Sequence, residues 1–410
     1  MDYINKLYAG RIGGESFGLG TGFFKFEKIK KARRSARRES PNVMLIDLGV
    51  GEPDAMADMG IIEKLNEQAR VWDNRGYADN GIIEFQRAAA SYMEKLYGVK
   101  ELEPEKEVIH VMGSKSALTI LPQAFINPGD ITLMTTPGYP IIGTITEWLN
   151  GEVYELPLKK ENLFLPDLTK IPEEILGRAK ILYINYPNNP TGSVATKEFY
   201  EEVVTFAKRY QVIVVQDAAY AAITFHGQKP LSFLSIPGGK QVGIEIHSLS
   251  KAFNMTGWRL GFACGNEKII AALAAVKNNY DSGQFKAIQH AGIYALEHPE
   301  ITLKTCEKYE RRHKKLSQLL QEIGFDVTAP LASFYQYTAI PYSAGDGTIF
   351  TNAEQFTEYL LKNALISTVP YDDEGHYIRL SVTFVASDEE EEDMVIEEIG
   401  KRMRTLQLEF

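Results

Sequence analysis

The sequence has few cysteines and no long apolar run. Its 410 residues include only two cysteines, Cys264 and Cys306, which are too few for a disulfide framework and lack metal-ligand spacing. So small a number is compatible with a reducing compartment. No apolar stretch reaches the roughly 18 residues that a membrane-spanning helix needs, and the N-terminus lacks the apolar core of a secretory signal. These absences predict a cytoplasmic protein with neither a metal site nor a membrane association.

An excess of basic residues is also missing, because the formal net charge is −10. That balance argues against nucleic acid as the main partner. One basic stretch, Lys25–Arg38, runs against the average, and we interpret it as a helix with a solvated basic face rather than a binding patch. The acidic run Asp388–Asp393 is interpreted as the solvated first turn of a helix capped by Ser387.

The middle of the chain alternates short apolar runs with amphipathic segments. The clearest helical segment is Thr196–Arg209, where Phe199, Val203 and Phe206 share a face and Thr196 is a candidate cap. The apolar runs suit strands that are buried on both faces. They are Val108–Met112, Ile131–Thr135, Ile181–Asn185, Val212–Gln216, Glu245–Ser248 and Leu260–Cys264. This alternation predicts an α/β fold with a large, mostly parallel sheet.

The two ends of the chain differ from the middle. The C-terminal part begins with a long charged helix, Pro299–Ile323, and continues with two strand-like segments, Ser333–Ile340 and Tyr377–Phe384. We therefore predict a smaller α+β domain built from both termini. The expected division is an N-terminal arm with part of the small domain (1–50), a large α/β domain (51–295) and a small C-terminal domain (296–410).

Polar clusters follow several of the predicted strands, at the edge of the sheet where α/β proteins bind ligands. Gly113-Ser114-Lys115-Ser116 offers free backbone N–H groups for an anion, although such turns are common before helices. Asp217 ends another strand, where an active-site acid and a helix cap are equally plausible. Lys251 and Arg259 follow a third strand. An amine, an acid, hydroxyls and an arginine together suit a phosphate-bearing aldehyde cofactor that is held as a Schiff base by lysine.

The strings that carry these residues resemble the class I/II aminotransferases, which have the fold type I of pyridoxal-phosphate-dependent transferases. SLSKAFNMTGWRLG resembles the cofactor-lysine motif of that family. NNPTG resembles its asparagine-proline-threonine-glycine turn, and QDAAY its strand-end aspartate with a tyrosine three residues later. GVGEPD, GYADNG and PGYP also follow the family's order. The matching segments run from Gly49 to Arg379, and their order makes chance a poor explanation.

The resemblance implies specific roles around pyridoxal 5'-phosphate. Lys251 would form the Schiff base and act as the general acid/base of the proton shift. Asp217 would bind the pyridine nitrogen, which keeps it protonated. Tyr220 and Asn189 would hydrogen-bond the ring hydroxyl, and Tyr139 would stack on the ring.

Further roles concern the phosphate and the substrate. The residues implied around the phosphate are Ser114, Lys115, Ser248 and Arg259. Tyr77 would reach the phosphate of a neighbouring subunit, which implies a homodimer with shared active sites. Gly51 would allow close approach of the substrate, and Arg379 would grip its α-carboxylate in a bidentate fork. A surface ion pair is the structural alternative for Arg379.

The chain closely resembles one branch of the family, the LL-diaminopimelate aminotransferases. Enzymes of that branch use 2-oxoglutarate as acceptor in lysine and cell-wall biosynthesis. The features are RIGGESFG, FKFEKIKKA, GEPDAMADMG, RGYADNG and Lys115. Lys277, Asn278 and Asn279 occupy the region where some relatives carry a second substrate arginine. That departure disfavours an aspartate aminotransferase, which stays an alternative with alanine and aromatic aminotransferases. A lyase on the same fold, or an aminotransferase-like regulator, is the alternative from another class.

Two residues with reactive side chains are given structural roles. His247 precedes Ser248 but matches no role in the family, and a packed strand histidine is the better interpretation. Cys264 lies within an apolar strand and is interpreted as inert core.

Overall fold

The computed structural model describes residues 3–18 and 25–410, and the side chains from residue 29 onward in the second range. Residues 1–2 and 19–24 of the predicted N-terminal arm lie outside the described residues, including Phe24 of the string FKFEKIKKA. Three short 3-10 helices come first: η1 Tyr3–Leu7, η2 Gly10–Ile12 and η3 Gly14–Ser16.

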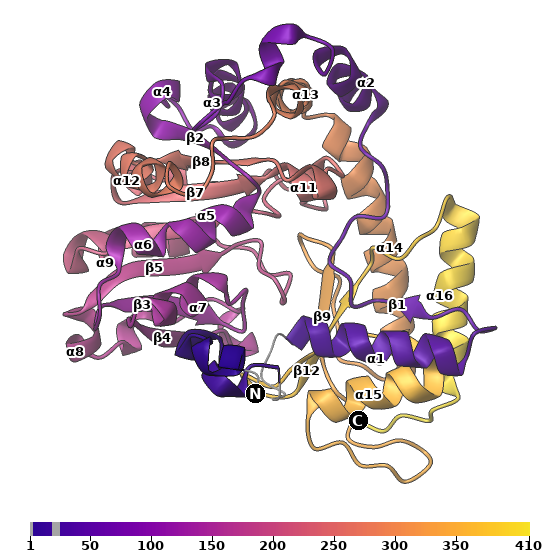
Figure 1. The fold of residues 1–410 in the computed structure, drawn as a ribbon. Helices are drawn as coiled ribbons and strands as arrows, with labels where there is room; N and C mark the ends of the chain where they lie inside the picture. The colour runs from indigo at the N-terminus through magenta and orange to yellow at the C-terminus, as the bar shows by residue number, and fades with distance from the viewer. Residues whose placement is uncertain (1–2, 19–24) are drawn as a thin grey trace.

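A seven-stranded sheet forms the centre of the larger part of the molecule, in the order β2-β8-β7-β6-β5-β3-β4 (Figure 1). Its strands are β2 Val108–Val111, β3 Ile131–Thr136, β4 Glu152–Pro157, β5 Ala179–Asn185, β6 Ile213–Asp217, β7 Gly243–Ser248 and β8 Gly261–Gly265. Strand β8 runs antiparallel to β2 and β7, whereas the remaining neighbours are parallel. The prediction of a large, mostly parallel sheet is confirmed.

The inner strands are buried along nearly their whole length because helices cover both faces of the sheet, whereas the edge strand β4 is largely exposed. The helices of this part are α2 Met59–Gln68, α3 Ile83–Tyr97, α4 Pro104–Glu107, α5 Ser114–Ile120, α6 Pro122–Phe125, α7 Ile141–Trp148, α8 Glu173–Leu176, α9 Lys197–Tyr210, α10 Gly239–Val242, α11 Leu249–Ala252, α12 Glu267–Lys277 and α13 Lys286–Glu297. Short 3-10 helices are η4 Trp72–Arg75, η5 Lys160–Asn162, η6 Leu168–Lys170, η7 Phe233–Ser235 and η8 Thr256–Trp258.

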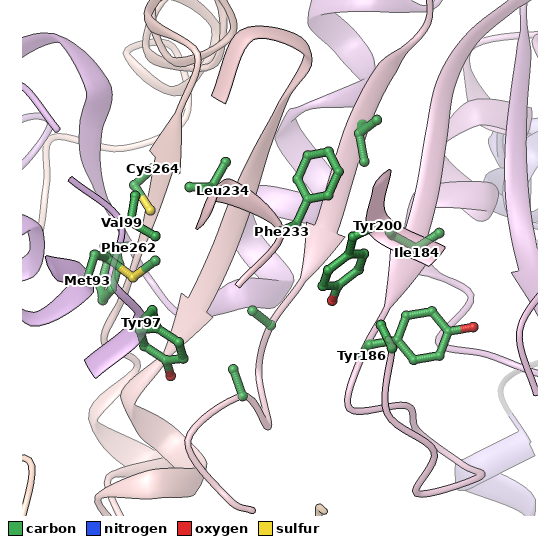
Figure 2. Close-up of a cluster of buried hydrophobic side chains, with 14 of the residues drawn as sticks. Met93, Tyr97, Val99, Ile184, Tyr186, Tyr200, Phe233, Leu234, Phe262 and Cys264 are labelled. Atoms are coloured by element: carbon green, nitrogen blue, oxygen red, sulfur yellow. The ribbon is translucent and has the colours of Figure 1, made fainter. Parts of the chain in front are cut away.

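Figure 2 shows the apolar layer on one face of this sheet, in which aromatic rings from several elements meet. Tyr200 of α9 packs edge-on against Phe233, with ring centroids 5.5 Å apart. Helix α9 begins as predicted, because the Thr196 side chain accepts a hydrogen bond from the backbone N–H of Phe199. The apolar face of α9 is buried, and β6 begins shortly after the helix ends.

The smaller part contains a three-stranded antiparallel sheet in the order β11-β12-β9. Its elements are α14 Ile301–Ile323, β9 Tyr335–Ala339, α15 Ala353–Ala364, β11 Val369–Tyr371, β12 Tyr377–Ser381 and α16 Glu389–Arg404. The N-terminal segment joins it, since β1 Ile46–Asp47 pairs with β10 Ile366–Ser367. Helix α1 Lys25–Glu39 lies beside α15 (Figure 1). The chain after β1 then crosses to the larger sheet.

The predicted cap of the last helix is wrong by one residue. Asp388, rather than Ser387, caps α16, and its carboxylate accepts from the backbone N–H of Glu391. The run that follows is not solvated throughout either. Glu392 is buried and bonds Arg311 and Arg312. The burial of Glu392 could not be predicted from the acidic run alone, because its arginine partners on α14 lie about 80 residues away in the sequence.

Candidate active site

A cavity of about 270 Å³ opens at the carboxyl ends of β5, β6 and β7, between the large sheet and the small one. Every site residue proposed from the sequence lines it, with the exception of Tyr77. Those residues are Gly51, Ser114, Lys115, Tyr139, Asn189, Asp217, Tyr220, Ser248, Lys251, Arg259 and Arg379. Parallel strands place their carboxyl ends at one edge, so residues from 51 to 379 in the sequence converge there.

Lys251 lies on α11, the short helix that begins directly after β7. Its Nζ donates a hydrogen bond to the backbone oxygen of Gly51, at 2.6 Å. Burial lowers the pKa of Lys251 to about 8, Glu52 opposes the shift, and Arg259 and Arg379 add to it. The amine therefore loses its proton more readily than an ordinary lysine, as a nucleophile must.

Asp217 is the last residue of β6 and is 4% exposed. Its Oδ2 accepts a hydrogen bond from the hydroxyl of Tyr183 at 3.2 Å, and its Oδ1 accepts from the backbone N–H of Ala219 at 3.3 Å. Burial raises the pKa of Asp217 to about 6, although both hydrogen bonds oppose that rise. The carboxylate is thus poorly compensated by this chain alone, and a cation in the cavity would stabilise it.

Arg259 forms one wall of the cavity beside the turn that precedes α5. Its Nη1 donates to the backbone oxygen of Thr256 at 2.8 Å and lies 3.3 Å from the hydroxyl of Ser250. A Cβ at Gly113 would lie 2.2 Å from Arg259 Nη2, and Gly113 has a positive φ of 77°. Only glycine permits this close approach, which sets the guanidinium beside Ser114. Cationic and hydroxyl groups so arranged suit a phosphate.

Arg379 of β12 is 2% exposed, so the alternative of a surface ion pair is wrong. Its Nη1 donates to Asn189 Oδ1 and its Nη2 to the backbone oxygen of Gly49, both at 2.8 Å. The guanidinium also lies over the ring of Tyr335, 4.1 Å from its centroid. The fork is therefore held in place within the cavity wall by neighbours from three segments.

Tyr77 lies away from the cavity of its own chain and is 82% exposed. The loop that carries it is nevertheless held firmly, because the backbone N–H groups of Ala78 and Asp79 donate to Ser282 O. Lys277 is 1% exposed on its side chain and donates to Asp79 O and to Asp281 Oδ1. Lys277 thus holds this loop, and its ammonium group is engaged in the contacts with Asp79 O and Asp281.

Four cavity-lining residues were missed in the sequence. They are Asn185, Ala219, Ser250 and Tyr335. Ser250 and Ala219 lie inside the strings SLSK and QDAAY, so those strings contained the signal. Asn185 is a polar residue at the end of a strand, the same signal that pointed to Asp217. Tyr335 lies in an ordinary strand pattern, and no local signal distinguishes it.

The two residues that were given structural roles are both buried in strands. His247 stacks on Phe262 and bonds Glu245, with Nε2 and Oε2 2.9 Å apart. Cys264 is fully buried in β8. Among residues 3–18 and 25–410, no cluster of three or more histidine, cysteine or acidic side chains could hold a metal. Within the same ranges, each helix is too short or too polar to cross a bilayer.

A mostly parallel sheet with a lysine, a strand-end carboxylate and two arginines around one cavity defines a fold type I transferase of the pyridoxal-phosphate-dependent class. The profile of the family described as aminotransferase class I and II matches residues 43–399. This chain belongs to that family.

Known relatives and solved structures agree with the family. The LL-diaminopimelate aminotransferase of Methanocaldococcus jannaschii is 58% identical, over 100% of this chain and 99% of its own length. The enzyme of the same name from Methanococcus maripaludis is 52% identical, over 100% and 99%. Substrate-bound BacF from Bacillus subtilis superposes with a TM-score of 0.88 at 33% identity, covering 98% of both chains. An aspartate aminotransferase mutant from Thermus thermophilus gives 0.83 at 26%, covering 96% and 99%.

Proposed function

We propose that this protein transfers an amino group from LL-diaminopimelate to 2-oxoglutarate with pyridoxal 5'-phosphate as cofactor. The observation that carries the proposal is the convergence of Lys251, Asp217, Arg259 and Arg379 on one cavity. The choice of substrate is supported by full-length relatives of that name at 58% and 52% identity.

The residues around the cavity fit the cofactor group by group. Pyridoxal phosphate combines an aldehyde, a basic ring nitrogen and a phosphate, and when bound it supplies an electron sink. The poorly compensated carboxylate of Asp217 suits the protonated ring nitrogen, because burial raises the pKa of this group and a facing cation would favour its charged form. Arg259, Ser114 and Ser248 suit the phosphate at the opposite end.

Lys251 would move the proton in each half-reaction. Its amine lies at the cavity wall and bonds a backbone oxygen, so it can exchange a proton without disturbing an ion pair. The pKa of Lys251, lowered to about 8 by burial, lies near working pH, where a general acid and base is most effective. Tyr220 and Asn189 would donate hydrogen bonds to the ring hydroxyl, and Tyr139 would stack on the ring.

Arg379 would bind the α-carboxylate that both substrates share. Its buried fork presents two parallel N–H groups, which match a carboxylate in geometry as well as charge. The distal ends of the substrates differ, since one is a zwitterion and the other a lone carboxylate. Lys115 lines the cavity and Glu52 follows the cavity-lining Gly51; both side chains are exposed and together they offer both signs of charge. Charges of both signs near the cavity are compatible with a zwitterionic and with an anionic distal end.

We further propose a cytoplasmic homodimer in which Tyr77 reaches the phosphate of the second active site. The support is that Tyr77 is 82% exposed on a loop held by Lys277, and that large side chains on neighbouring stretches of the sequence, before this loop and after Lys277, are also exposed. Trp72 is 70% exposed and Tyr280 is 56% exposed. Domain boundaries near residues 50 and 295 stay predictions.

The cofactor assignment is tested by borohydride reduction of protein purified with pyridoxal phosphate, followed by peptide mapping. A pyridoxyl group on Lys251 is expected. An adduct on another lysine, or none, would contradict the assignment.

The substrate is tested by comparing kcat/KM for LL-diaminopimelate, aspartate, alanine and phenylalanine with 2-oxoglutarate as acceptor. The highest value is expected for LL-diaminopimelate. A higher value for any other donor would overturn the substrate but not the transamination. Release of pyruvate or ammonia without a pyridoxamine product would instead identify a lyase.

The shared site is tested by mixing Lys251→Ala protein with Tyr77→Phe protein. If Tyr77 acts across the interface, some hybrids recover one normal site, and activity rises above that of either parent. Sedimentation that shows a fully active monomer would exclude the shared site.

A further inference from the structure

Tyr335 contacts several of the groups to which the proposed function assigns a role. It is the first residue of β9, its side chain is 2% exposed, and it lines the cavity. Its hydroxyl lies 2.9 Å from that of Tyr220, and its ring lies beneath the guanidinium of Arg379. The same side chain thus touches the proposed partner of the cofactor's ring hydroxyl and the proposed ligand of the substrate carboxylate.

The strand register explains the contact with Arg379. Strands β9 and β12 are antiparallel, and Tyr335 pairs with Ser381, so Arg379 lies two residues along the neighbouring strand on the same face. Its guanidinium extends over the Tyr335 ring, with Cζ 4.1 Å from the centroid. Stacking on an aromatic face is attractive and restricts the plane of the guanidinium. Asn189 and Gly49 hold the outer edge of the fork, so the ring supplies the face on which it rests.

The hydroxyl of Tyr335 occupies space that exists only because residue 51 is glycine. A Cβ at Gly51 would lie 2.1 Å from this oxygen, closer than any real contact allows. The backbone oxygen of Gly51 also accepts from Lys251. Gly51 therefore serves the Tyr335 hydroxyl as well as the amine, which explains the need for glycine here without any reference to substrate.

We propose that Tyr335 is a positioning residue that aligns Tyr220 through its hydroxyl and Arg379 through its ring. This inference rests on the proposed function, because it assigns Tyr335 to the same cavity. Burial raises the pKa of Tyr220 well above its ordinary value, so the Tyr220 hydroxyl keeps its proton and has a single hydrogen to donate. When Tyr335 donates to the Tyr220 oxygen, that hydrogen is directed away from Tyr335 and toward the cavity.

The two contacts predict separable effects, which two substitutions distinguish. Tyr335→Phe removes the hydroxyl but keeps the ring. Tyr220 then donates more weakly to the cofactor's ring oxygen, whose anionic form is less stabilised. The pH midpoint of the bound cofactor's visible absorption should therefore rise, by about 0.5–1 pH unit for one hydrogen bond. KM for the amino donor should change less than about 2-fold, because the guanidinium keeps its aromatic support.

Tyr335→Leu removes both the hydroxyl and the ring. The same rise of the absorption midpoint is expected, together with an increase in KM of about 10-fold for donors with an α-carboxylate. Tyr337→Phe is the matched control, because Tyr337 lies two residues along β9 and outside the cavity lining. It should leave both quantities unchanged. Melting temperatures measured alongside identify any variant that fails to fold, and Tyr335→Phe alters the core least.

The outcomes separate this inference from the proposed function. A wild-type protein with no visible band and no adduct on Lys251 would overturn both. A normal wild-type band whose midpoint is the same in Tyr335→Phe would overturn the role of the hydroxyl alone. An equal rise of KM in Tyr335→Phe and Tyr335→Leu would overturn the separate role of the ring.

Discussion

Two groups of buried charges in this molecule have different kinds of partner. One group lies around the cavity, and the other is the cluster that Arg312 of α14 forms with Glu392 and Asp54. In the Arg312 cluster, Arg312 is fully buried and forms ion pairs with Glu392 at 2.8 Å and with Asp54 at 3.1 Å. Its Nη1 also donates to two backbone oxygens, those of Val382 and Phe384. Around the cavity, by contrast, Lys251 donates to a neutral backbone oxygen and Asp217 accepts from a neutral hydroxyl.

The two carboxylates show what this difference does. Burial acts to raise the pKa of both Glu392 and Asp217. At Glu392, the hydrogen bonds and positive charges of Arg311 and Arg312 together outweigh burial, and the pKa is lowered. At Asp217 the neutral partners do not outweigh it, and the pKa is raised to about 6. A buried charge that is paired with opposite charges holds segments of the fold together. A buried charge with only neutral partners beside a cavity can instead pair with a charged ligand.

The largest effect is expected from removing the cavity amine. Lys251→Ala should reduce kcat by about 10⁴-fold or more, because both the covalent attachment and the general acid/base are lost. Lys240→Ala is the control, since Lys240 bonds Glu107 and Glu101 O at a distance from the cavity. Single-turnover kinetics measure the effect. Comparable losses in both variants would mean that Lys251 has no special role.

Disrupting the Arg312 cluster should lower the stability of the fold. Arg312→Met leaves the carboxylates of Asp54 and Glu392 without this partner and should lower the free energy of unfolding by about 3–5 kcal/mol. Denaturant titration measures it.

The control for Arg312 is an exposed pair of the same type. Arg178 bonds both oxygens of Glu152 at 2.7 and 2.9 Å, but both side chains are about half exposed. Arg178→Met should change stability by less than about 1 kcal/mol. If both arginines give the same small change, the cluster does not stabilise the fold.

Removing the cavity carboxylate should affect turnover. Asp217→Ala should lower kcat by about 10²-fold or more, because a single charged partner contributes a few kcal/mol to the reaction. Asp217→Asn removes the charge but keeps the shape, since the amide oxygen can still accept from the N–H of Ala219 and the amide nitrogen can donate to the hydroxyl of Tyr183. Near-normal turnover in the asparagine variant would mean that the charge of Asp217 has no role in the reaction and that the residue only forms the turn.

The smallest effect concerns the Tyr183 hydroxyl and depends on pH. The folded pKa of Asp217, about 6, lies above its ordinary value, so its contribution to stability is present at low pH and lost as pH rises through about 6. Tyr183→Phe removes a donor to the charged form and raises this pKa further. Cofactor-free protein should therefore lose about 1 kcal/mol at pH 8 and little at pH 4.

Tyr186→Phe is the matched control for that measurement. Tyr186 is equally buried, but its hydroxyl donates to the neutral backbone oxygen of Phe164 at 2.7 Å. Its loss should be the same at both pH values. A pH-independent loss in Tyr183→Phe as well would show that its hydroxyl does not act through the Asp217 charge.

Much of the fold and of the site could be predicted because the relevant information is local. Apolar runs indicated every strand of the large sheet except β4, which is an exposed edge strand and carries no apolar run. The residue that follows such a run lies at the ligand-binding edge whatever the rest of the chain does. Lys251 and Asp217 were found in this way, and the resemblance assigned their roles. The cap of α16 was misassigned because Ser387 and Asp388 are adjacent and either can cap a helix.

Only the tertiary structure decided which side chains support these residues. Tyr335 reaches Tyr220 and Arg379 through the register of β9 with β12, and Tyr183 reaches Asp217 through the pairing of β5 with β6. Strand register depends on long-range packing and leaves no mark in a short string of residues. The sequence by itself determined the chemistry that the cavity could perform. The tertiary structure decided how far each charge is compensated, because that depends on contacts between distant segments.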